Sequence, residues 1–222
     1  MPPLAFGGQL FEVAGRTALF WPARAALIVA DLHLEKASWF ATHGQMLPPY
    51  DSIATLSRVA LLVKQTGARE MWCLGDNFHD NDGAVRLEGA ARVLLTELAA
   101  GVAWHWITGN HDFALTDRLG GTVLEEAEVG GLILRHRAEA GEARPELSGH
   151  YHPKYRASAR GRSVSRPCFV RSEHKLIFPA FGALTGGLAA NHPEIMNIAG
   201  LRPQALVPTE DRLLAFNLRA GA

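Results

Sequence analysis

Short apolar runs, each followed at once by polar residues, recur along this chain and limit its fold more than any other feature of the sequence. Clear examples are residues 26–30, 71–74, 102–107 and 132–134. Runs of this length are typical of strands buried in a sheet. Because ligands in α/β proteins bind beyond the carboxyl ends of strands, we expect several strand ends to converge on one pocket. The sequence therefore predicts an α/β fold with a site at its strand ends.

The polar residues that follow these runs form five short motifs. In chain order they are Asp31-Leu-His33, Gly75-Asp76-Asn77-Phe78-His79-Asp80, Gly109-Asn110-His111-Asp112, the lone His136, and Gly149-His150-Tyr151-His152. One motif alone is a weak signal. Five in this order are hard to explain as scattered histidines and aspartates, and they indicate a two-metal site that acts on phosphate esters.

The spacing within the motifs has a physical reason. Residues i and i+2 of a strand point to the same face, so Asp31 and His33 are expected to reach one ion. His150 and His152 have the same spacing and are expected to do the same from another strand end. Two ions about 3.5–4 Å apart need a bridging carboxylate, and Asp76 is the best candidate.

The ligand types narrow the choice of metal. The motifs supply carboxylates, imidazoles and one carboxamide, with no thiolate. This mixture suits two divalent transition metal ions (manganese, iron or zinc) better than an all-oxygen calcium site or a cysteine-based structural zinc site.

The motif series resembles that of the calcineurin-like metallophosphoesterase superfamily, from about Asp31 to His152. This resemblance implies a four-layer sandwich, in which two mixed β-sheets pack face to face and are flanked by helices. It also implies that His111 contacts the phosphate and helps the leaving group depart, and that Asp112 orients His111 through a hydrogen bond. Carried over by motif, the ligands of the first metal are Asp31, His33, Asp76 and His152, and those of the second are Asp76, Asn110, His136 and His150.

Within the superfamily the chain is similar to the small bacterial ligase-associated metallophosphoesterases. The features that support this are Asp31-Leu-His33-Leu-Glu35-Lys36, Gly149-His150-Tyr151-His152-Pro153 and Leu176-Ile177-Phe178-Pro179-Ala180-Phe181-Gly182. The narrower resemblance implies a manganese-dependent phosphodiesterase or DNA endonuclease. It also implies a role in DNA repair alongside an ATP-dependent DNA ligase, a helicase and an exonuclease.

Other functions are compatible with the same motifs. A phosphomonoesterase or protein phosphatase is one alternative, but Ser/Thr phosphatases carry Asp-Arg-Gly and Gly-Asn-His-Glu where this chain has His79-Asp80-Asn81 and Gly109-Asn110-His111-Asp112. A hydrolase of nucleotides or lipid-linked nucleotides is a second alternative. A binding subunit without activity is a third, and the complete ligand set argues against it.

A basic segment follows the last motif. Between Lys154 and Lys175 only Glu173 opposes the cations. We expect Arg160, Arg162 and Arg166 to contact the phosphates of a nucleic acid. The alternative is a solvated loop whose arginines pair with acids elsewhere, such as Glu125, Glu126 and Glu128.

Two roles are open for His79. We expect it either to lie near the metals and contact the substrate, or to cap the turn and the helix that follows. Trp39, in a loop-like stretch after the first motif, is the best candidate for an exposed ring that stacks on a base.

Composition sets the remaining expectations. A chain of 222 residues with 48% hydrophobic and 20% charged residues is expected to form one globular domain, residues 1–222. Its net charge is +0, so the chain has no overall positive field that would indicate a nucleic-acid partner. The sequence predicts no membrane span and no signal peptide. Cys73 and Cys168 read as buried free thiols in a reducing, cytoplasmic compartment. An exposed edge strand would support a homodimer.

The pattern of the chain also predicts individual elements. We expect a hairpin from residues 8–13 and 16–21, and helices over residues 51–65 and 84–99. Residues 137–145 are expected to form a loop, and the chain after Pro153 is expected to be rich in strands.

Overall fold

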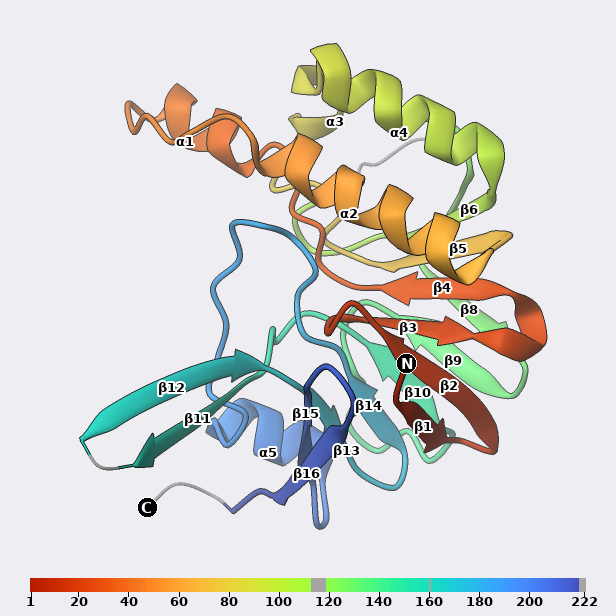
Figure 1. Ribbon diagram of the computed structural model, residues 1–222, viewed down its shortest axis with the longest axis vertical. Helices are drawn as coiled ribbons and strands as arrows, with labels where there is room; N and C mark the ends of the chain where they lie inside the picture. Colours follow the sequence, from red (N-terminus) through yellow and green to blue (C-terminus); the bar gives the residue numbers. More distant parts are fainter. Residues whose placement is uncertain (113–118, 160, 220–222) are drawn as a thin grey trace.

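The computed structural model describes residues 1–112, 119–159 and 161–219, which form two large sheets that lie face to face (Figure 1). Among the described residues each sheet has seven strands. The first contains, in spatial order, β1 (Pro3–Phe6), β2 (Gln9–Ala14), β3 (Ala18–Trp21), β4 (Ala26–Val29), β5 (Glu70–Leu74), β6 (Ala103–Ile107) and β7 (Thr122–Leu124). The second contains β16 (Leu213–Asn217), β15 (Gln204–Pro208), β13 (Phe169–Arg171), β14 (Lys175–Ile177), β10 (Glu146–Ser148), β9 (Leu132–Arg135) and β8 (Glu126–Val129).

Both sheets are mixed. In the first, β4 to β7 are parallel neighbours, whereas β1 to β4 pair antiparallel. In the second, β10 is parallel to both β9 and β14, and the other pairs are antiparallel. The carboxyl ends of β4, β5 and β6 therefore meet at one edge, as do those of β9, β10 and β14.

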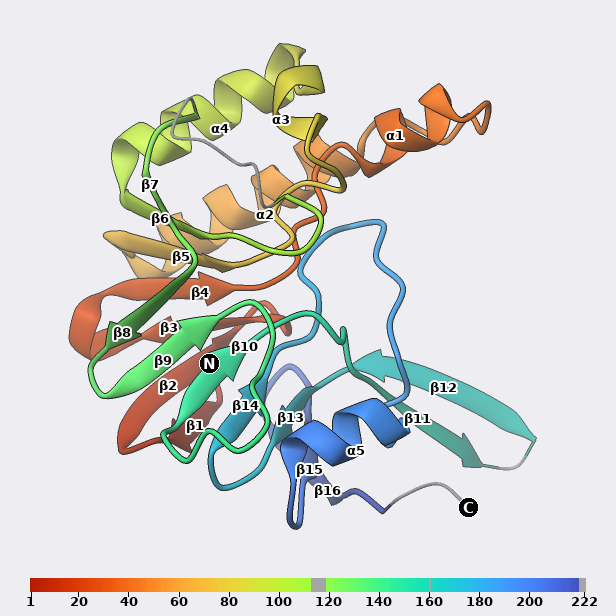
Figure 2. The same ribbon diagram turned by 180° about the vertical axis from the view of Figure 1, so that it is seen from behind.

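Helices cover the outer faces of the two sheets. Helices α2 (Asp51–Thr66) and α4 (Gly89–Gly101) lie over the first sheet, and α5 (Pro193–Ala199) lies over the second (Figures 1 and 2). The shorter α1 (Lys36–Thr42), α3 (Gly83–Arg86) and the 3-10 helix η1 (Pro22–Arg24) complete the helices of the described residues. The predicted four-layer sandwich is confirmed.

Three apolar clusters hold the layers together. The central one lies between the sheets and contains Trp21, Leu134 and Phe178, all at most 1% exposed. A second lies under α2 and α4, and a third joins α5 to the second sheet. Cys73 and Cys168 are buried in the two outer clusters as free thiols, as the sequence predicts.

The helix expected over residues 84–99 is instead two helices, α3 and α4. Glu88, between them, has extended angles (φ −134°, ψ 177°), and Gly89 follows with a φ of +57°. Leu87 is 1% exposed and packs in the cluster under α2 and α4. The break falls at Glu88 and Gly89, while Leu87 stays packed in the apolar cluster.

A two-stranded ribbon projects from the sandwich (Figure 1). Its antiparallel strands are β11 (Lys154–Ala159) and β12 (Arg162–Pro167), and every residue of β12 is exposed. The sequence predicted strands in this region without predicting the ribbon, because exposed polar strands lack the apolar alternation that marks a buried face. No helix in the described residues is long and apolar enough to cross a membrane.

Replacing Lys175 by Met is expected to lower the free energy of unfolding by about 3 kcal/mol, because a buried carboxylate loses the closer of its two cationic partners. Lys175 Nζ lies 2.9 Å from Oε1 of the fully buried Glu146, on the neighbouring strand. Denaturant titration measures the loss. The double variant Lys175→Met/Glu146→Leu should recover most of it, and an equal loss in both variants would contradict the expectation.

Candidate metal centre

The sequence motifs occupy loops that leave the carboxyl ends of strands in both sheets. They follow β4 (Asp31 and His33), β5 (Asp76), β6 (Asn110), β9 (His136) and β10 (His150 and His152). Backbone hydrogen bonds join the loops, since Asp31 N donates to Gly75 O at 3.2 Å and Gly149 N donates to His136 O at 2.8 Å. The structure thus brings all seven predicted ligands together from five strand ends.

Four of these side chains form a first group, made of Asp31, His33, Asp76 and His152. Their ligand atoms all lie within 4.8 Å of one another. His152 Nε2 is 3.4 Å from Asp31 Oδ1, and His33 Nε2 is 3.8 Å from Asp76 Oδ2. The two Nε2 atoms face each other at 3.2 Å. Converging lone pairs of this kind can hold one divalent cation.

Asp76, His136 and His150 form a second group under the same 4.8 Å criterion. His136 Nε2 lies 3.4 Å from Asp76 Oδ1. The carboxamide of Asn110 joins the group, since its Oδ1 is 2.9 Å from His136 Nε2 and 3.0 Å from His150 Nδ1. Asp76 therefore presents Oδ2 to the first group and Oδ1 to the second, which is the arrangement a bridging carboxylate needs.

Three glycines make room for the two groups. A Cβ at Gly75 would lie 2.3 Å from His136 Nδ1, one at Gly109 would lie 2.2 Å from Asp76 Oδ1, and one at Gly149 would lie 2.5 Å from Asp31 Oδ2. Real side chains do not tolerate such distances. Together with a donor set free of thiolates, this space makes each group a candidate site for a divalent metal ion.

Burial keeps the histidines in the form that binds a cation. It lowers the pKa of His33 to about 3 and that of His150 to about 4, so both rings are neutral at neutral pH. Burial also raises the pKa of Asp76. For Asp31 burial opposes ionisation, but the hydrogen bond and charge of His152 hold the pKa below its ordinary value.

Five of the seven residues have a left-handed backbone. Their φ angles are Asp31 54°, His33 44°, Asp76 44°, His150 74° and His152 49°. The i,i+2 pairs Asp31/His33 and His150/His152 therefore do not lie in an extended strand, in contrast to the expectation from the sequence. The turns send His150 and His152 to different groups, so the expectation from spacing that both reach one ion is wrong, while the division implied by the family resemblance matches the geometry.

His111 and Asp112 follow Asn110 but have different surroundings. The His111 side chain is 44% exposed, with Nε2 3.8 Å from Asp76 Oδ2. The Asp112 side chain is buried and accepts hydrogen bonds from the backbone N–H groups of Asn77 (2.7 Å), Phe78 (3.2 Å) and Gly109 (2.8 Å). No hydrogen bond joins Asp112 to the His111 ring in the described part of the chain, so the expected orienting contact is wrong. The carboxylate instead fixes the loops after β5 and β6.

His79 lies beside the groups rather than in them. Its ring stacks on His111 with 5.5 Å between the ring centroids, and its centroid is 5.6 Å from that of His33. The Trp39 ring, on α1 rather than in a loop, is 4.8 Å from His79 and half-buried. These rings form a wall on one side of the centre.

Two of the three acids that the sequence offered as partners of the basic segment form ion pairs elsewhere. Glu126 pairs with Arg135 at 3.1 Å, and Glu128 pairs with Arg144 at 3.2 Å. Neither Arg162 nor Arg166 has an ion pair among the described residues. Arg160 lies outside the described residues.

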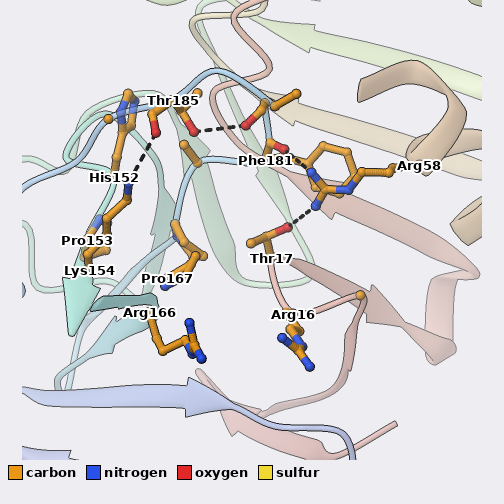
Figure 3. Close-up of a pocket in the computed structure, with 16 residues that line it drawn as sticks. Arg16, Thr17, Arg58, His152, Pro153, Lys154, Arg166, Pro167, Phe181 and Thr185 are labelled. Carbon is orange, nitrogen blue, oxygen red and sulfur yellow. Dashed lines mark hydrogen bonds between the residues drawn. The ribbon is translucent and has the colours of Figure 1, made fainter. Parts of the chain in front are cut away.

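A cavity of about 330 Å³ opens beside His152, between the β2–β3 turn, the base of the ribbon and residues 179–186 (Figure 3). Besides His152 it is lined by four cationic side chains: Arg16, Arg58, Lys154 and Arg166. Sequence reasoning missed Arg16 and Arg58, because neither lies in a motif or a charge run. Only the predicted turn near Gly15 pointed to this region.

Comparisons with known proteins agree with this geometry. The family model described as calcineurin-like phosphoesterase matches residues 26–204. The structure is similar to the nuclease MPE of Pseudomonas putida, with a TM-score of 0.69 and 28% identity over 92% of this chain and 95% of that one. It also matches Yfce, a phosphoesterase from E. coli, with a TM-score of 0.40 and 18% identity over 82% of this chain and 87% of that one. A comparison with curated proteins finds no match.

Gly149→Ala is expected to weaken manganese binding about 10–100-fold, because the added methyl group displaces a ligand carboxylate. The new Cβ would lie 2.5 Å from Asp31 Oδ2 and 2.8 Å from Ala30 Cβ. Calorimetric titration of the metal-free protein measures the affinity. Gly101→Ala is the matched control, because nothing lies within 4 Å of that Cβ. Unchanged affinity in Gly149→Ala would contradict the role of this space.

Proposed function

The chain belongs to the calcineurin-like phosphoesterase family, and from this we propose that it is a dinuclear, manganese-dependent phosphodiesterase that cuts DNA as an endonuclease. The observation that carries the proposal is the pair of ligand groups that share Asp76, with one carboxylate oxygen in each. The likeness to a nuclease over nearly the full length of both chains supports the choice of substrate.

We assign the two ions to the two groups. Asp31, His33, Asp76 and His152 hold the first, and Asp76, Asn110, His136 and His150 hold the second. Manganese is the ion that the family resemblance favours, with iron and zinc as the alternatives that the ligand types allow. When bound, two such ions polarise the phosphate and lower the pKa of a water molecule so that it can attack.

The remaining steps belong to side chains of this chain. His111 is half-exposed beside the shared Asp76, where it can reach a bound phosphate and donate a proton to the departing oxygen. His111 N also donates a hydrogen bond to Asp76 Oδ1 at 3.1 Å, so His111 and the shared carboxylate are held in fixed relation. Asp112 positions both through the loops that it fixes.

A nucleic acid is a better match than a small ester because the surroundings of the centre are basic and open. The exposed strand β12 carries Arg162 and Arg166 on one face, and Arg166 reaches the cavity beside His152. Action in DNA repair with a ligase, a helicase and an exonuclease stays a prediction from the resemblance, as does a homodimer. Free, buried Cys73 and Cys168 are consistent with the proposed cytoplasmic location.

Asn110→Ala is expected to abolish turnover while the fold stays intact, because the second group loses the carboxamide between its two histidines. The assay compares bis(p-nitrophenyl) phosphate, the matching monoester and closed-circular plasmid DNA, all with manganese. Cleavage of the diester and the plasmid by the parent protein, lost in the variant, supports the proposal. Turnover of the monoester alone would make the protein a phosphomonoesterase, and activity retained by Asn110→Ala would refute the ligand assignment.

His111→Ala is expected to slow cleavage of a dinucleotide by about 10²-fold or more, the usual contribution of a general acid. The loss on bis(p-nitrophenyl) phosphate should be much smaller, since p-nitrophenolate leaves as a stable anion and needs no proton. Steady-state rates on both substrates measure the contrast. Equal losses would show that His111 acts by binding the phosphate rather than by donating a proton.

A further inference from the structure

The cavity beside His152 joins the metal centre to the surface of the molecule. The His152 side chain contributes to the first ligand group and also lines the cavity. The other walls come from parts far apart in the sequence: the turn at Arg16, the base of the ribbon at Lys154 and Arg166, and the segment 179–186 (Figure 3). A chain that has one phosphate at the centre can therefore continue into this cavity.

Two of the cavity's cations already have partners. The Arg58 guanidinium donates to Phe181 O at 2.9 Å and to Thr17 Oγ1 at 3.0 Å, and it lies 4.3 Å from the centroid of the Phe181 ring. Lys154 Nζ donates to Thr185 O at 3.2 Å. Arg58 is thus a fixed part of the wall, whereas an ammonium group has three donors and Lys154 has used one.

The other two cations have no partner within the described residues. Neither the Arg16 side chain nor the Arg166 side chain has a hydrogen bond, an ion pair or a ring contact there. Figure 3 shows their guanidinium groups on facing sides of the cavity. No Asp or Glu lines this cavity in the described part of the chain. Arg16 and Arg166 also line a neighbouring groove that contains two acids, Glu210 and Asp211, but neither acid forms an ion pair with them among the described residues.

The backbone at Arg16 is a further sign of a ligand. Arg16 has a φ of +74° in a tight turn, where Gly15 has a φ of +58°. Glycine and asparagine are the usual residues at such positions, because the Cβ atom of most other residues is strained there. A strained arginine whose side chain has no partner, beside the proposed path of the substrate, indicates that its charge is kept for binding.

We propose that this cavity is a binding subsite for a second phosphate of the nucleic-acid strand, held between the guanidinium groups of Arg16 and Arg166 with help from Lys154. The inference rests on the proposed function for its ligand, but it is a statement about anion binding and does not need turnover. It makes the enzyme selective for chains that carry a phosphate next to the one that is cleaved.

Binding without metal tests the subsite independently of catalysis. In EDTA, the anisotropy of a fluorescein-labelled eight-nucleotide oligothymidylate gives the association constant as a function of salt. Each lost phosphate contact should reduce the slope of log K against log[salt] by about 0.7 for a single strand. Arg16→Gly and Arg166→Ala are both expected to do so. Arg69→Ala is the control, because Arg69 is exposed and lies next to the amino end of β5, away from the strand ends that carry the motifs.

Arg16→Gly separates a binding role from a structural one. Glycine favours a positive φ, so the variant should keep or raise the melting temperature while it loses affinity. A fall in melting temperature would show that Arg16 stabilises the turn, and Arg166→Ala would then decide the question alone. If the slope of log K against log[salt] is unchanged in both variants, the proposed subsite is refuted.

Turnover then tests the position of the subsite. A thymidine dinucleotide with a phosphate at its 5′ or its 3′ end is compared with the same dinucleotide without one. We expect one end phosphate to raise kcat/KM by about tenfold, as a charge-assisted contact should, and Arg16→Gly/Arg166→Ala to abolish this advantage. An advantage that survives in the double variant overturns the proposal. If the variants alter the salt slope but the parent protein cleaves no diester, the proposed function is refuted and the anion-binding site is still supported.

Discussion

The face-to-face packing of the two sheets is the contact on which the metal centre depends. Asp31, His33, Asp76 and Asn110 come from the first sheet, whereas His136, His150 and His152 come from the second. Neither sheet can complete a ligand group alone, since each group contains residues of both. The central apolar cluster sets the distance between the two sets of strand ends, so it also sets the distances among the ligands. A loss of packing far from the ligand groups would therefore alter the distances within them.

The same packing has to offset unfavourable features of the site. A left-handed backbone at a residue other than glycine costs about 1–3 kcal/mol, and five of the seven residues have one. Asp31 is fully buried and Asp76 almost so, next to imidazoles that burial keeps neutral. Cations bound only by the folded chain would remove much of this cost. The backbone angles thus argue that the chain is shaped for its ligands before they bind.

The sequence predicted those parts of the molecule that are marked by an apolar run or by a short local motif. Apolar runs marked β4, β5, β6 and β9, and the motifs after them supplied all seven residues of the two groups. Spacing alone failed where the backbone left the strand conformation, as at His150 and His152. The split at Leu87 and the contacts of Asp112 depend on tertiary packing, which a pattern of residue types does not encode. Arg16 was missed for the same reason, because the cations that it faces across the cavity are about 140–150 residues away in sequence.

The residues of the ligand groups and the residues proposed to select the substrate lie in different kinds of structure. The ligand loops are tied to buried strands and to glycines that admit no side chain, so they cannot vary without loss of the centre. Strand β12 of the ribbon is exposed along its whole length, so its side chains can change at small cost to stability. The turn at Arg16 lies between these extremes, since its backbone is constrained while its guanidinium is free. A fold that many phosphoesterases share can therefore direct one centre to different phosphate chains by changing a turn and a ribbon beside it.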